Sequence, residues 1–573
     1  MKIFGEKNAR WKIVARPVLC GVAAGLAAVA FQNSIHWLYE NGVARFARLS
    51  APEFLLYSLL ALAGTATTAA LLVTRFCPDA AGSGSPQLKL AFWKDFGVVR
   101  WRTTWTKFLG SALTVGGGCS LGNEGPMVQI GGGAASNLAG ALGVPAHMRR
   151  EAAAAGAAAG LAAIFNAPMA AVAFVLEEVV ENLNSRLIGA ILIAAVTGAL
   201  TAHFFMGDAS VFTIPATVRA NWAVYVFTPP IAALASLAGA AFQKLALGVR
   251  ARGRTAFPRV PAAAKIVVGA LCVWAIGSAV FLATGRLGVF SLGYGDLSAA
   301  LNAELAWGVA ALLLGAKLLA TALCYGLGGC GGIFAPALFF GGTCGAALAG
   351  ALALCVPAVG AEEVSALAVV GMCACFGSVV RAPVTGVLLV FEMTHHFSLV
   401  PALMLGGIVS VAVSKFFSKN GFYDEVLAQD GKEISRVIPP RDLRAWQDSP
   451  VSRIANFAPR TLREDASAAD AAALLAEYGF ARFPVADGAG RARGLVLRET
   501  LEAALARGGD FSVGALPLRG VPACSRETRI REVERLLIEA ADGLVVVEDG
   551  AGRLVGVVTL HDVLRAEMHF NEM

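Results

Sequence analysis

The chain has 573 residues and a formal net charge of +7, and 57% of its residues are hydrophobic while only 15% are charged. Because soluble globular proteins carry about 25% charged residues, this composition excludes an ordinary soluble enzyme. The modest positive charge also gives no reason to expect a nucleic acid partner.

Three basic residues, Arg10, Lys12 and Arg16, lie close to the N-terminus, and no small-residue cleavage site follows them. We therefore expect no signal peptide. The excess of positive charge predicts a cytoplasmic N-terminus, with the C-terminal domain on the same side. For a bacterial chain, the expected location is the inner (plasma) membrane.

Charge is sparse from Lys12 to Leu427 and dense from Ile434 to Met573. This contrast predicts a membrane domain over residues 1–433, followed by a soluble domain. Several apolar stretches approach the roughly 20 residues that cross a bilayer. They are Val18–Phe31, Phe54–Val73, Leu187–Phe205, Val224–Leu245 and Lys265–Leu282, with more between Leu305 and Phe417.

Other apolar stretches are short and broken by glycine, such as Phe108–Cys119 and Ile333–Cys355. Interrupted segments at membrane depth occur where backbone lines a cavity or is buried in protein. This pattern favours a transporter or a channel. Neither a nucleophile–base constellation nor a phosphate-binding loop indicates an enzyme.

The cysteines and histidines give no metal-ligand spacing. Cys373 and Cys375 lie in one helical segment and are expected to be buried by packing. His395 and His396 follow an apolar run, which predicts a helix end there. We therefore expect no metal and no resident cofactor.

The membrane domain contains an internal repeat. Shifting the chain by 215 residues aligns Gly156–Glu178 with a second segment, matching Pro168 to Pro383 and Glu177 to Glu392. A shift of 210 aligns Gly122–Pro126 with Gly332–Pro336 in the same way. Two such halves indicate the repeat architecture of transporters, whose substrate site lies where the halves meet. Periodicity alone leaves open whether the repeat is inverted or parallel.

Three segments place glycine and proline at the start of an apolar, helical stretch: Gly82–Pro86, Gly122–Pro126 and Gly331–Pro336. Proline suits a first helical turn, and glycine permits close backbone approach. The free N–H groups of a first turn attract anions, so converging helix starts form an anion site. Each motif alone could equally be an ordinary membrane-helix break.

These three segments, in this order, resemble the signature motifs of the CLC family of chloride channels and chloride/proton antiporters. Leu161–Pro168, Phe174–Glu178 and Gly421–Asp424 resemble the same family, and the match runs from Arg16 to Leu427. The resemblance implies an all-α membrane domain with inverted repeats. It also implies a homodimer with a separate pathway in each subunit.

Carried over residue by residue, the resemblance assigns the central chloride to the hydroxyls of Ser83 and Tyr423 and the backbone amides of Ile333 and Phe334. It makes Glu124 the gating glutamate, whose carboxylate can occupy the anion site when ionised. From the residues alone, Ser83 could be a helix cap and Tyr423 an interfacial aromatic.

The neighbouring Glu177 and Glu178 end an apolar helix and could be a solvated surface pair. The resemblance identifies Glu178 as the internal proton-transfer residue, which favours chloride/proton antiport over a passive, voltage- or pH-gated chloride channel. Glu177 would shape the inner proton route. Asn123 departs from the lysine or arginine usual in chloride-selective members and keeps fluoride/proton exchange as a further alternative.

The C-terminal domain repeats one unit, in which strand, tight Asp-Gly turn, strand and helix follow each other. The repeat resembles a tandem CBS pair, an α/β domain, with modules over residues 448–506 and 511–573. Such pairs often bind adenine nucleotides, and Asp562 matches the ribose-binding position, where the first module has Thr500. The alternative to nucleotide binding is a purely structural pair. The alternative to transport is a sensor protein whose membrane domain only anchors the CBS pair.

Overall fold

The computed structural model describes residues 2–182, 187–207, 211–215, 217–418, 420–432, 445–540 and 542–571. The chain divides into two compact units, Met1–Ile438 and Pro439–Met573. The predicted domain ends at residues 433 and 573 lie outside the described residues. So do the side chains of Arg10 and Lys12, on which the predicted N-terminal orientation depends.

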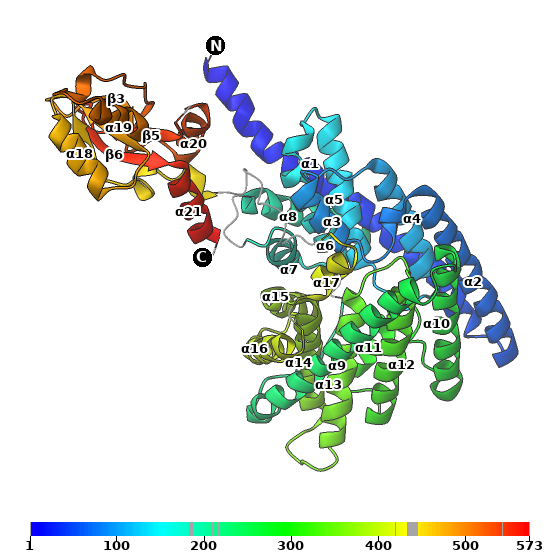
Figure 1. The fold of residues 1–573 in the computed structure, drawn as a ribbon. Helices are drawn as coiled ribbons and strands as arrows, with labels where there is room; N and C mark the ends of the chain where they lie inside the picture. The colour runs from blue at the N-terminus through cyan, green and yellow to red at the C-terminus, as the bar shows by residue number, and fades with distance from the viewer. Residues whose placement is uncertain are drawn as a thin grey trace. The chain divides into compact units, whose positions relative to one another are not determined.

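The described residues of the first unit form helices joined by loops, with no β-strand among them (Figure 1). Its first half contains α1 (Lys2–Tyr39), α2 (Ala51–Phe76), α3 (Ser85–Lys94), α4 (Trp101–Gly116), α5 (Glu124–Ala141), α6 (Arg150–Phe165), α7 (Pro168–Phe174) and α8 (Ile188–Met206). Its second half contains α9 (Trp222–Thr255), α10 (Ala262–Thr284), α11 (Tyr294–Leu301), α12 (Trp307–Gly326), α13 (Phe334–Leu352), α14 (Ala361–Val380), α15 (Pro383–Thr394) and α16 (Val400–Phe417), and α17 (Phe422–Gln429) follows.

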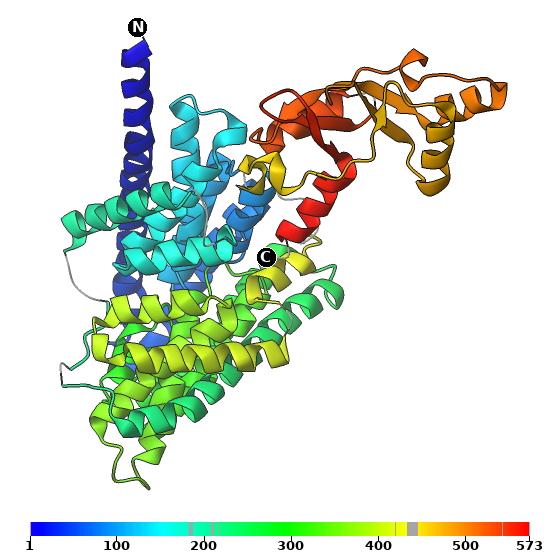
Figure 2. The ribbon, with the colours of Figure 1, turned by 90° about the vertical axis from the view of Figure 1, so that its left-hand side faces the viewer.

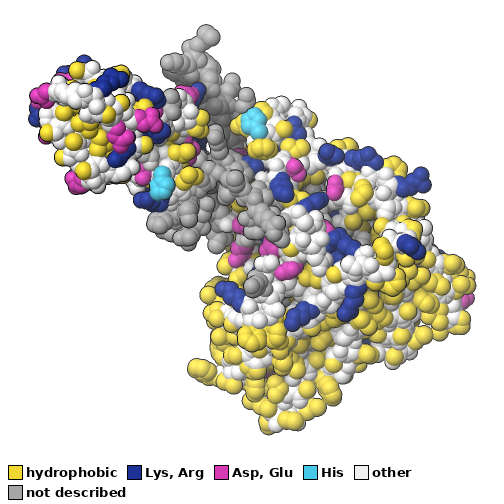
Figure 3. Space-filling model, viewed as in Figure 1, with side chains coloured by type: hydrophobic (Ala, Val, Ile, Leu, Met, Phe, Trp, Pro, Cys, Tyr) yellow, Lys and Arg dark blue, Asp and Glu magenta, His cyan; other side chains and the backbone are white. Residues whose placement is uncertain are grey.

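Among the described residues, nine helices are long and apolar enough to cross a membrane. Hydrophobic side chains cover a broad continuous surface of this unit, while the charged ones gather at its border (Figure 3). A surface of this kind faces lipid, so the chain is an integral membrane protein. Two of these nine helices, α13 and α14, are mostly buried and are packed inside the unit beside α9 (Figures 1 and 2).

The predicted repeat is present in the structure, since the helices of the two halves correspond in order from α1 with α9 to α8 with α16. The tight packing of α5 on α6 and of α13 on α14 uses equivalent glycines. A Cβ on Gly131 would overlap the carbonyl oxygen of Gly156, and one on Gly341 would overlap that of Gly371. Small residues let membrane helices approach this closely.

The same break in the helix also occurs twice. Asn166 ends α6 with φ at 52°, and Arg381 ends α14 with φ at 64°. Pro168 then begins α7, and Pro383 begins α15. Because proline fits a first turn but not a helix interior, each break is dictated locally. His395 is the C-cap of α15, as predicted, and Cys373 and Cys375 are buried.

The helices α7 and α15 are each capped by a glutamate from the other half of the unit, and we call these two contacts the exchanged caps. Glu392 accepts hydrogen bonds from the N–H groups of Met169 (3.0 Å) and Ala170 (2.7 Å) at the start of α7. Glu177 accepts them from Thr385 (2.8 Å) at the start of α15. Such reciprocal contacts are what a two-fold relation between the halves produces, in agreement with an inverted repeat.

The second unit contains two copies of one small α/β module. Its elements are β1 (Leu462–Arg463), α18 (Ala468–Glu477), β2 (Arg482–Ala486), β3 (Ala492–Leu497) and α19 (Arg498–Arg507), then β4 (Ala523–Ser525), α20 (Ile530–Glu539), β5 (Leu544–Glu548), β6 (Leu554–Thr559) and α21 (Leu560–Asn571). Each three-stranded sheet has one parallel and one antiparallel pair, in the order β1-β2-β3 and β4-β5-β6. The predicted Asp-Gly turns join β2 to β3 and β5 to β6.

Candidate anion-binding site

The three glycine-rich segments meet each other through their backbones. Gly122 and Gly332 exchange hydrogen bonds in both directions, at 2.7 and 2.6 Å, and the N–H of Gly331 donates to the carbonyl oxygen of Gly82 (3.1 Å). A Cβ on Gly332 would lie 2.8 Å from the nitrogen of Gly125. Glycine is therefore required for this approach. Sequence motifs more than 200 residues apart form one site where the halves meet.

Both predicted hydroxyl ligands are buried, and among the described residues neither has a hydrogen-bond partner. Ser83 precedes α3, and Tyr423 lies in the first turn of α17. Both are at most 1% exposed, and among the described residues their hydroxyl oxygens, like that of Ser85, have no hydrogen-bond partner. Buried hydroxyls are usually paired, so these unpaired donors fit a bound anion. Tyr423 is thus a buried residue and not an interfacial aromatic.

The predicted backbone ligands lie at the start of α13. Ile333 is its N-cap and Phe334 its first residue, and both are fully buried. The ring of Phe334 is held between those of Phe174 (4.9 Å) and Phe376 (4.6 Å). A first turn offers N–H groups without intrahelical acceptors. The aromatic packing fixes where these groups point.

Lys107, on α4, is a site residue that sequence reasoning missed. It is fully buried, and its Nζ donates to the carbonyl oxygens of Gly82 (2.5 Å) and Ala80 (3.1 Å). These bonds fix the loop that carries Ser83 and place a cation behind it. A lysine in an otherwise apolar stretch was the signal, and the 210-residue shift pairs it with Lys317.

Glu124, the first residue of α5, is fully buried beside the meeting point of the loops. Its Oε1 accepts a hydrogen bond from the Tyr294 hydroxyl (2.7 Å), and its Oε2 accepts one from the N–H of Ala335 (3.3 Å). A Cβ on Gly122 would overlap Oε2. The carboxylate therefore occupies an anion-binding position at the start of α13.

Glu178 lies in a π-helical turn, Val175–Val179, and contacts a second buried lysine that sequence reasoning missed. Lys89, on α3, makes ion pairs with Glu178 (3.0 Å), Glu181 (2.7 Å) and Asp424 (2.7 Å). The three donors of the ammonium group are thus shared among three carboxylates. Because Asp424 follows Tyr423, this cluster adjoins the hydroxyl ligands.

Glu177, although adjacent in sequence, has a different environment. Both oxygens of its carboxylate accept bonds at the start of α15, from the N–H of Val384 (3.3 Å) and from the N–H (2.8 Å) and hydroxyl (2.6 Å) of Thr385. This contact is a helix cap. The part in proton transfer that the sequence assigned to Glu177 stays a prediction.

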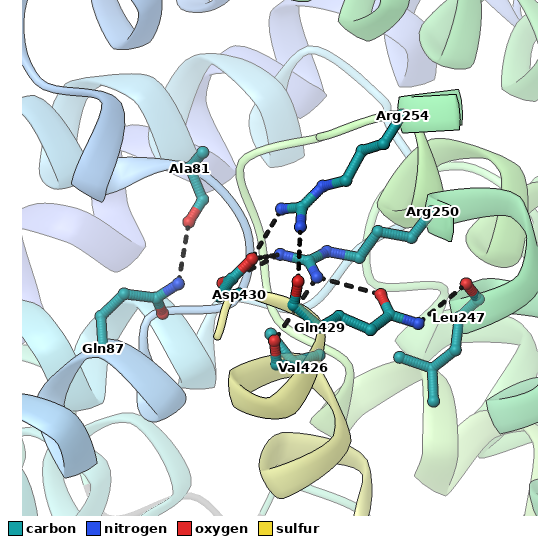
Figure 4. Close-up of polar contacts among 8 residues, drawn as sticks. All are labelled: Ala81, Gln87, Leu247, Arg250, Arg254, Val426, Gln429 and Asp430. Carbon is teal, nitrogen blue, oxygen red and sulfur yellow. Dashed lines mark hydrogen bonds and ion pairs between the residues drawn. The ribbon is translucent and has the colours of Figure 1, made fainter. Parts of the chain in front are cut away.

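A cavity of about 380 Å³ reaches the loop of Gly82 from the ends of α9 and α17. Arg250 and Arg254 converge on Asp430 at 2.8 and 2.7 Å, with Gln87 on the opposite wall (Figure 4). Burial raises the pKa of Asp430, but the bonds and charges of the two arginines outweigh it and hold that pKa below its ordinary value. The arginines make this cavity an attractive approach for anions.

Asn123, the N-cap of α5, is 1% exposed, and its Oδ1 has no partner among the described residues. It therefore adds a neutral polar group at the start of α5.

The second unit has a cavity of about 530 Å³ lined by Tyr478, Phe480, Arg460, Thr559 and Asp562. The rings of Tyr478 and Phe480 are stacked 5.7 Å apart, and Arg460 lies over Tyr478. Asp562 accepts bonds from the N–H (2.9 Å) and hydroxyl (2.7 Å) of Thr559 through one oxygen. Aromatic faces, a guanidinium and a carboxylate can together hold a nucleotide.

Comparison with known proteins finds the same two parts. Residues 60–415 match the family described as voltage gated chloride channel, and residues 451–507 and 513–569 match the CBS domain. The H(+)/Cl(−) exchange transporter ClcA of Cronobacter sakazakii is 31% identical over 426 residues, which are 72% of this chain and 88% of that protein.

Solved structures agree in fold. A slow cyanobacterial Cl−/H+ antiporter aligns with a TM-score of 0.66 at 25% identity, over 74% of this chain and 98% of its own. A eukaryotic CLC transporter aligns over 97% of this chain and 98% of its own, with a TM-score of 0.60 at 21% identity. The fold class predicted from the sequence, for both units, is confirmed.

Proposed function

This chain belongs to the voltage-gated chloride channel family, and we propose that it exchanges chloride for protons across the membrane, with Glu124 as gate and Glu178 as internal proton-transfer residue. The observation that carries the proposal is the position of Glu124. Its carboxylate accepts a bond from the N–H of Ala335 at the start of α13, where Ile333 and Phe334 supply the proposed backbone ligands of the anion. The ionised carboxylate and a bound chloride would therefore lie close together, and each disfavours the presence of the other.

In this mechanism, chloride enters from the arginine-lined cavity and is held by the hydroxyls of Ser83 and Tyr423 and the amides of Ile333 and Phe334. Neutral donors bind an anion without holding it too strongly for release. An arriving chloride repels the ionised Glu124 and favours the protonated, displaced side chain. Proton and chloride movements are coupled by this competition.

Protons reach the opposite side through Glu178. A carboxylate paired with a lysine takes up a proton when the lysine turns to another partner. Lys89 has two such partners, Asp424 and Glu181, both at 2.7 Å. Glu178 can thus be released from the pair without leaving a buried ammonium uncompensated.

Relatives that bear the name H(+)/Cl(−) exchange transporter support this proposal, since the chain covers most of their length. Two alternatives are a passive, voltage- or pH-gated chloride channel, favoured by the ion pair that ties Glu178 to Lys89, and fluoride/proton exchange, raised by the neutral Asn123. Flux measured with each anion, with and without proton movement, separates the three.

The Glu124→Ala variant tests the gate. In liposomes we expect it to keep chloride flux and to lose chloride-driven proton movement, because the titrating carboxylate is gone. A protein whose membrane part merely anchors a sensor would be indifferent to this change. Retained proton coupling in the variant would contradict the role of Glu124.

The remaining features of the family form part of the same proposal. We infer a homodimer with a pathway in each subunit, in a bacterial inner membrane, with the N-terminus and the CBS unit in the cytoplasm. The molar mass of the detergent-solubilised protein tests the dimer. Protease access to the C-terminal unit in intact, oriented vesicles tests the orientation.

We also propose that the cavity of the CBS unit binds an adenine nucleotide, with the ring near Tyr478 and Phe480 and the ribose at Asp562. The stacked aromatic pair and the nearby Arg460 support this assignment. Titration of the full chain with ATP and AMP should show binding that Asp562→Ala weakens at least about tenfold. A structural pair would bind neither nucleotide.

A further inference from the structure

The hydrogen bond between Tyr294 and Glu124 connects the gate to the second half of the membrane unit. Tyr294 is the first residue of α11, and a 210-residue shift places it opposite Gly84, just before α3. None of the three glycine-rich motifs includes it. At 2.7 Å its hydroxyl makes the shorter of the two contacts that tie Glu124 to the second half, the other being 3.3 Å from Ala335.

The loop that carries Tyr294 is held rigidly. Lys317 is fully buried, and its Nζ donates to the carbonyl oxygens of Gly288 (2.7 Å) and Ser291 (3.0 Å). The carboxylate of Asp296 accepts a bond from the N–H of Gly288 (2.6 Å). Because its loop is tied at several points, the tyrosine can hold a partner without yielding.

The ring of Tyr294 is also fixed from the side. It packs edge-on against Phe212, with centroids 5.3 Å apart, and Phe212 is itself buried and bonded through its N–H to the carbonyl of Met393 (3.2 Å). Gly293, with φ at 75°, turns the backbone into α11 just before the tyrosine. The hydroxyl therefore has one direction in which to donate, toward Glu124.

A phenol that donates to a carboxylate forms a charge-assisted hydrogen bond, which is stronger than a bond to the neutral acid. Such a bond favours the ionised, inserted Glu124 over the protonated, displaced one. Release of the gate must break it, whereas the longer bond from Ala335 offers less resistance.

We propose that Tyr294 is a positioning residue that latches the gating carboxylate in the anion pathway and thereby limits the rate of chloride movement. The latch acts through Glu124, and it rests on the proposed function of that residue. Tyr294 and Tyr423 would then have opposite tasks, since one hydroxyl holds the gate and the other holds the transported ion.

The Tyr294→Phe variant tests the latch, because it removes one hydroxyl and keeps the ring on Phe212. We expect chloride flux in liposomes to rise by about threefold or more. A hydrogen bond to a charged group is worth roughly tenfold or more in an equilibrium, and other steps absorb part of this gain. The matched control is Tyr225→Phe on α9, where the ring meets Trp222 away from the site, and its flux should not change.

The decisive arm repeats the change in the Glu124→Ala background, where no carboxylate is left to hold. There, Tyr294→Phe should alter chloride flux by less than about twofold, so that the two changes are not additive. A structural role for the hydroxyl would instead lower flux in both backgrounds. Unchanged flux in the native background, or an equal effect in both, overturns the latch.

Two further measurements separate loss of the hydrogen bond from loss of folding in Tyr294→Phe. The thermal unfolding temperature of Tyr294→Phe shows whether the variant is folded, and a carboxylate infrared band that shifts in Tyr294→Phe but is absent in Glu124→Ala reports the bond directly. An unshifted band overturns the proposal even if flux is lost. These experiments measure chloride flux and one vibration, and neither quantity depends on proton coupling. Absence of proton coupling in the native protein would therefore refute antiport but would leave the latch untouched.

Discussion

The two halves of the membrane unit share a framework and differ where each reaches the anion site. The shared positions are Lys107 with Lys317, Gly131 with Gly341, Gly156 with Gly371, and Glu177 with Glu392. In each pair both residues do the same work: the lysines tie loop carbonyls, the glycines admit a neighbouring helix, and the glutamates cap a helix of the other half.

The proposed transport residues have no such counterpart. The repeat places Gly293 opposite Ser83, Phe334 opposite Glu124, and Met393 opposite Glu178. Residues that repeat therefore hold the fold, and residues that break the repeat are the ones to which we assign the transport chemistry. An internal repeat thus separates structural from functional positions within one chain. The predictions below test the repeated positions and contrast one of them with a proposed transport residue.

The largest effect is expected at the paired lysines. Replacing Lys107 or Lys317 by Met removes at least two buried hydrogen bonds from the lysine to loop carbonyl oxygens, which costs about 3 kcal/mol or more of folding free energy. Both variants should unfold at clearly lower temperature in detergent, and Lys107→Met should also weaken chloride binding. The exposed Lys415→Met is the control. Equal stability of all three variants would show that the buried lysines do not hold the loops.

The adjacent glutamates should separate function from structure. Glu178→Gln removes the proposed proton carrier, and we expect proton transport to fall about tenfold or more while chloride flux persists. Glu177→Gln removes the same charge one residue away, on a helix cap, and should leave the ratio of proton to chloride movement unchanged. Liposome assays of both ions measure it. A loss of coupling in Glu177→Gln would instead give that residue the role predicted from the sequence.

A smaller and symmetric effect is expected from the exchanged caps. Neutralising Glu177 or Glu392 removes a carboxylate from a helix start, where it stabilises by about 1 kcal/mol. The two Gln variants should lower the unfolding temperature by similar amounts, since each caps the equivalent helix. A loss in only one variant would break the symmetry on which the comparison rests.

The smallest effect concerns the repeat in the CBS unit. Asp487 and Asp549 accept bonds at equivalent turns, and the backbone N–H groups of Arg491 and Arg553 hold the pKa of each carboxyl below its ordinary value. A carboxyl whose pKa is lowered by folding stabilises the folded unit at pH values above the unfolded pKa of 3.8. This stabilisation is lost as the pH falls through the folded pKa. Asn variants should therefore destabilise the unit slightly and equally at pH 7, as followed by hydrogen exchange at the turns. That difference should vanish in acid.

Much of the architecture was predictable because it depends on local chemistry. The starts of α3, α5 and α13 follow from the glycines before them and from the prolines in their first turns, which are Pro86, Pro126 and Pro336. The Asp-Gly turns follow from their own backbone preferences. Ser83 and Tyr423 were found through the resemblance, since neither residue has a distinctive local signal.

The rest depends on contacts between distant segments. Lys89, Lys107 and Tyr294 gain their importance from partners that lie 25 to 335 residues away, and no spacing rule predicts those partners. Glu177 and Glu178 are neighbours in sequence, but a π-helical turn sends them to different surroundings. The internal repeat does carry part of this information, because the 210-residue shift that aligns the glycine motifs also aligns Lys107 with Lys317.

The most direct test of the central claim is proton movement driven by a chloride gradient alone. Liposomes that contain the purified protein are given unequal chloride concentrations at equal pH, and the outer pH is followed as chloride moves down its gradient. Antiport predicts protons moving against their own developing gradient, and no such movement with Glu124→Ala. Chloride flux without any proton movement in the native protein would contradict the account and make it a channel.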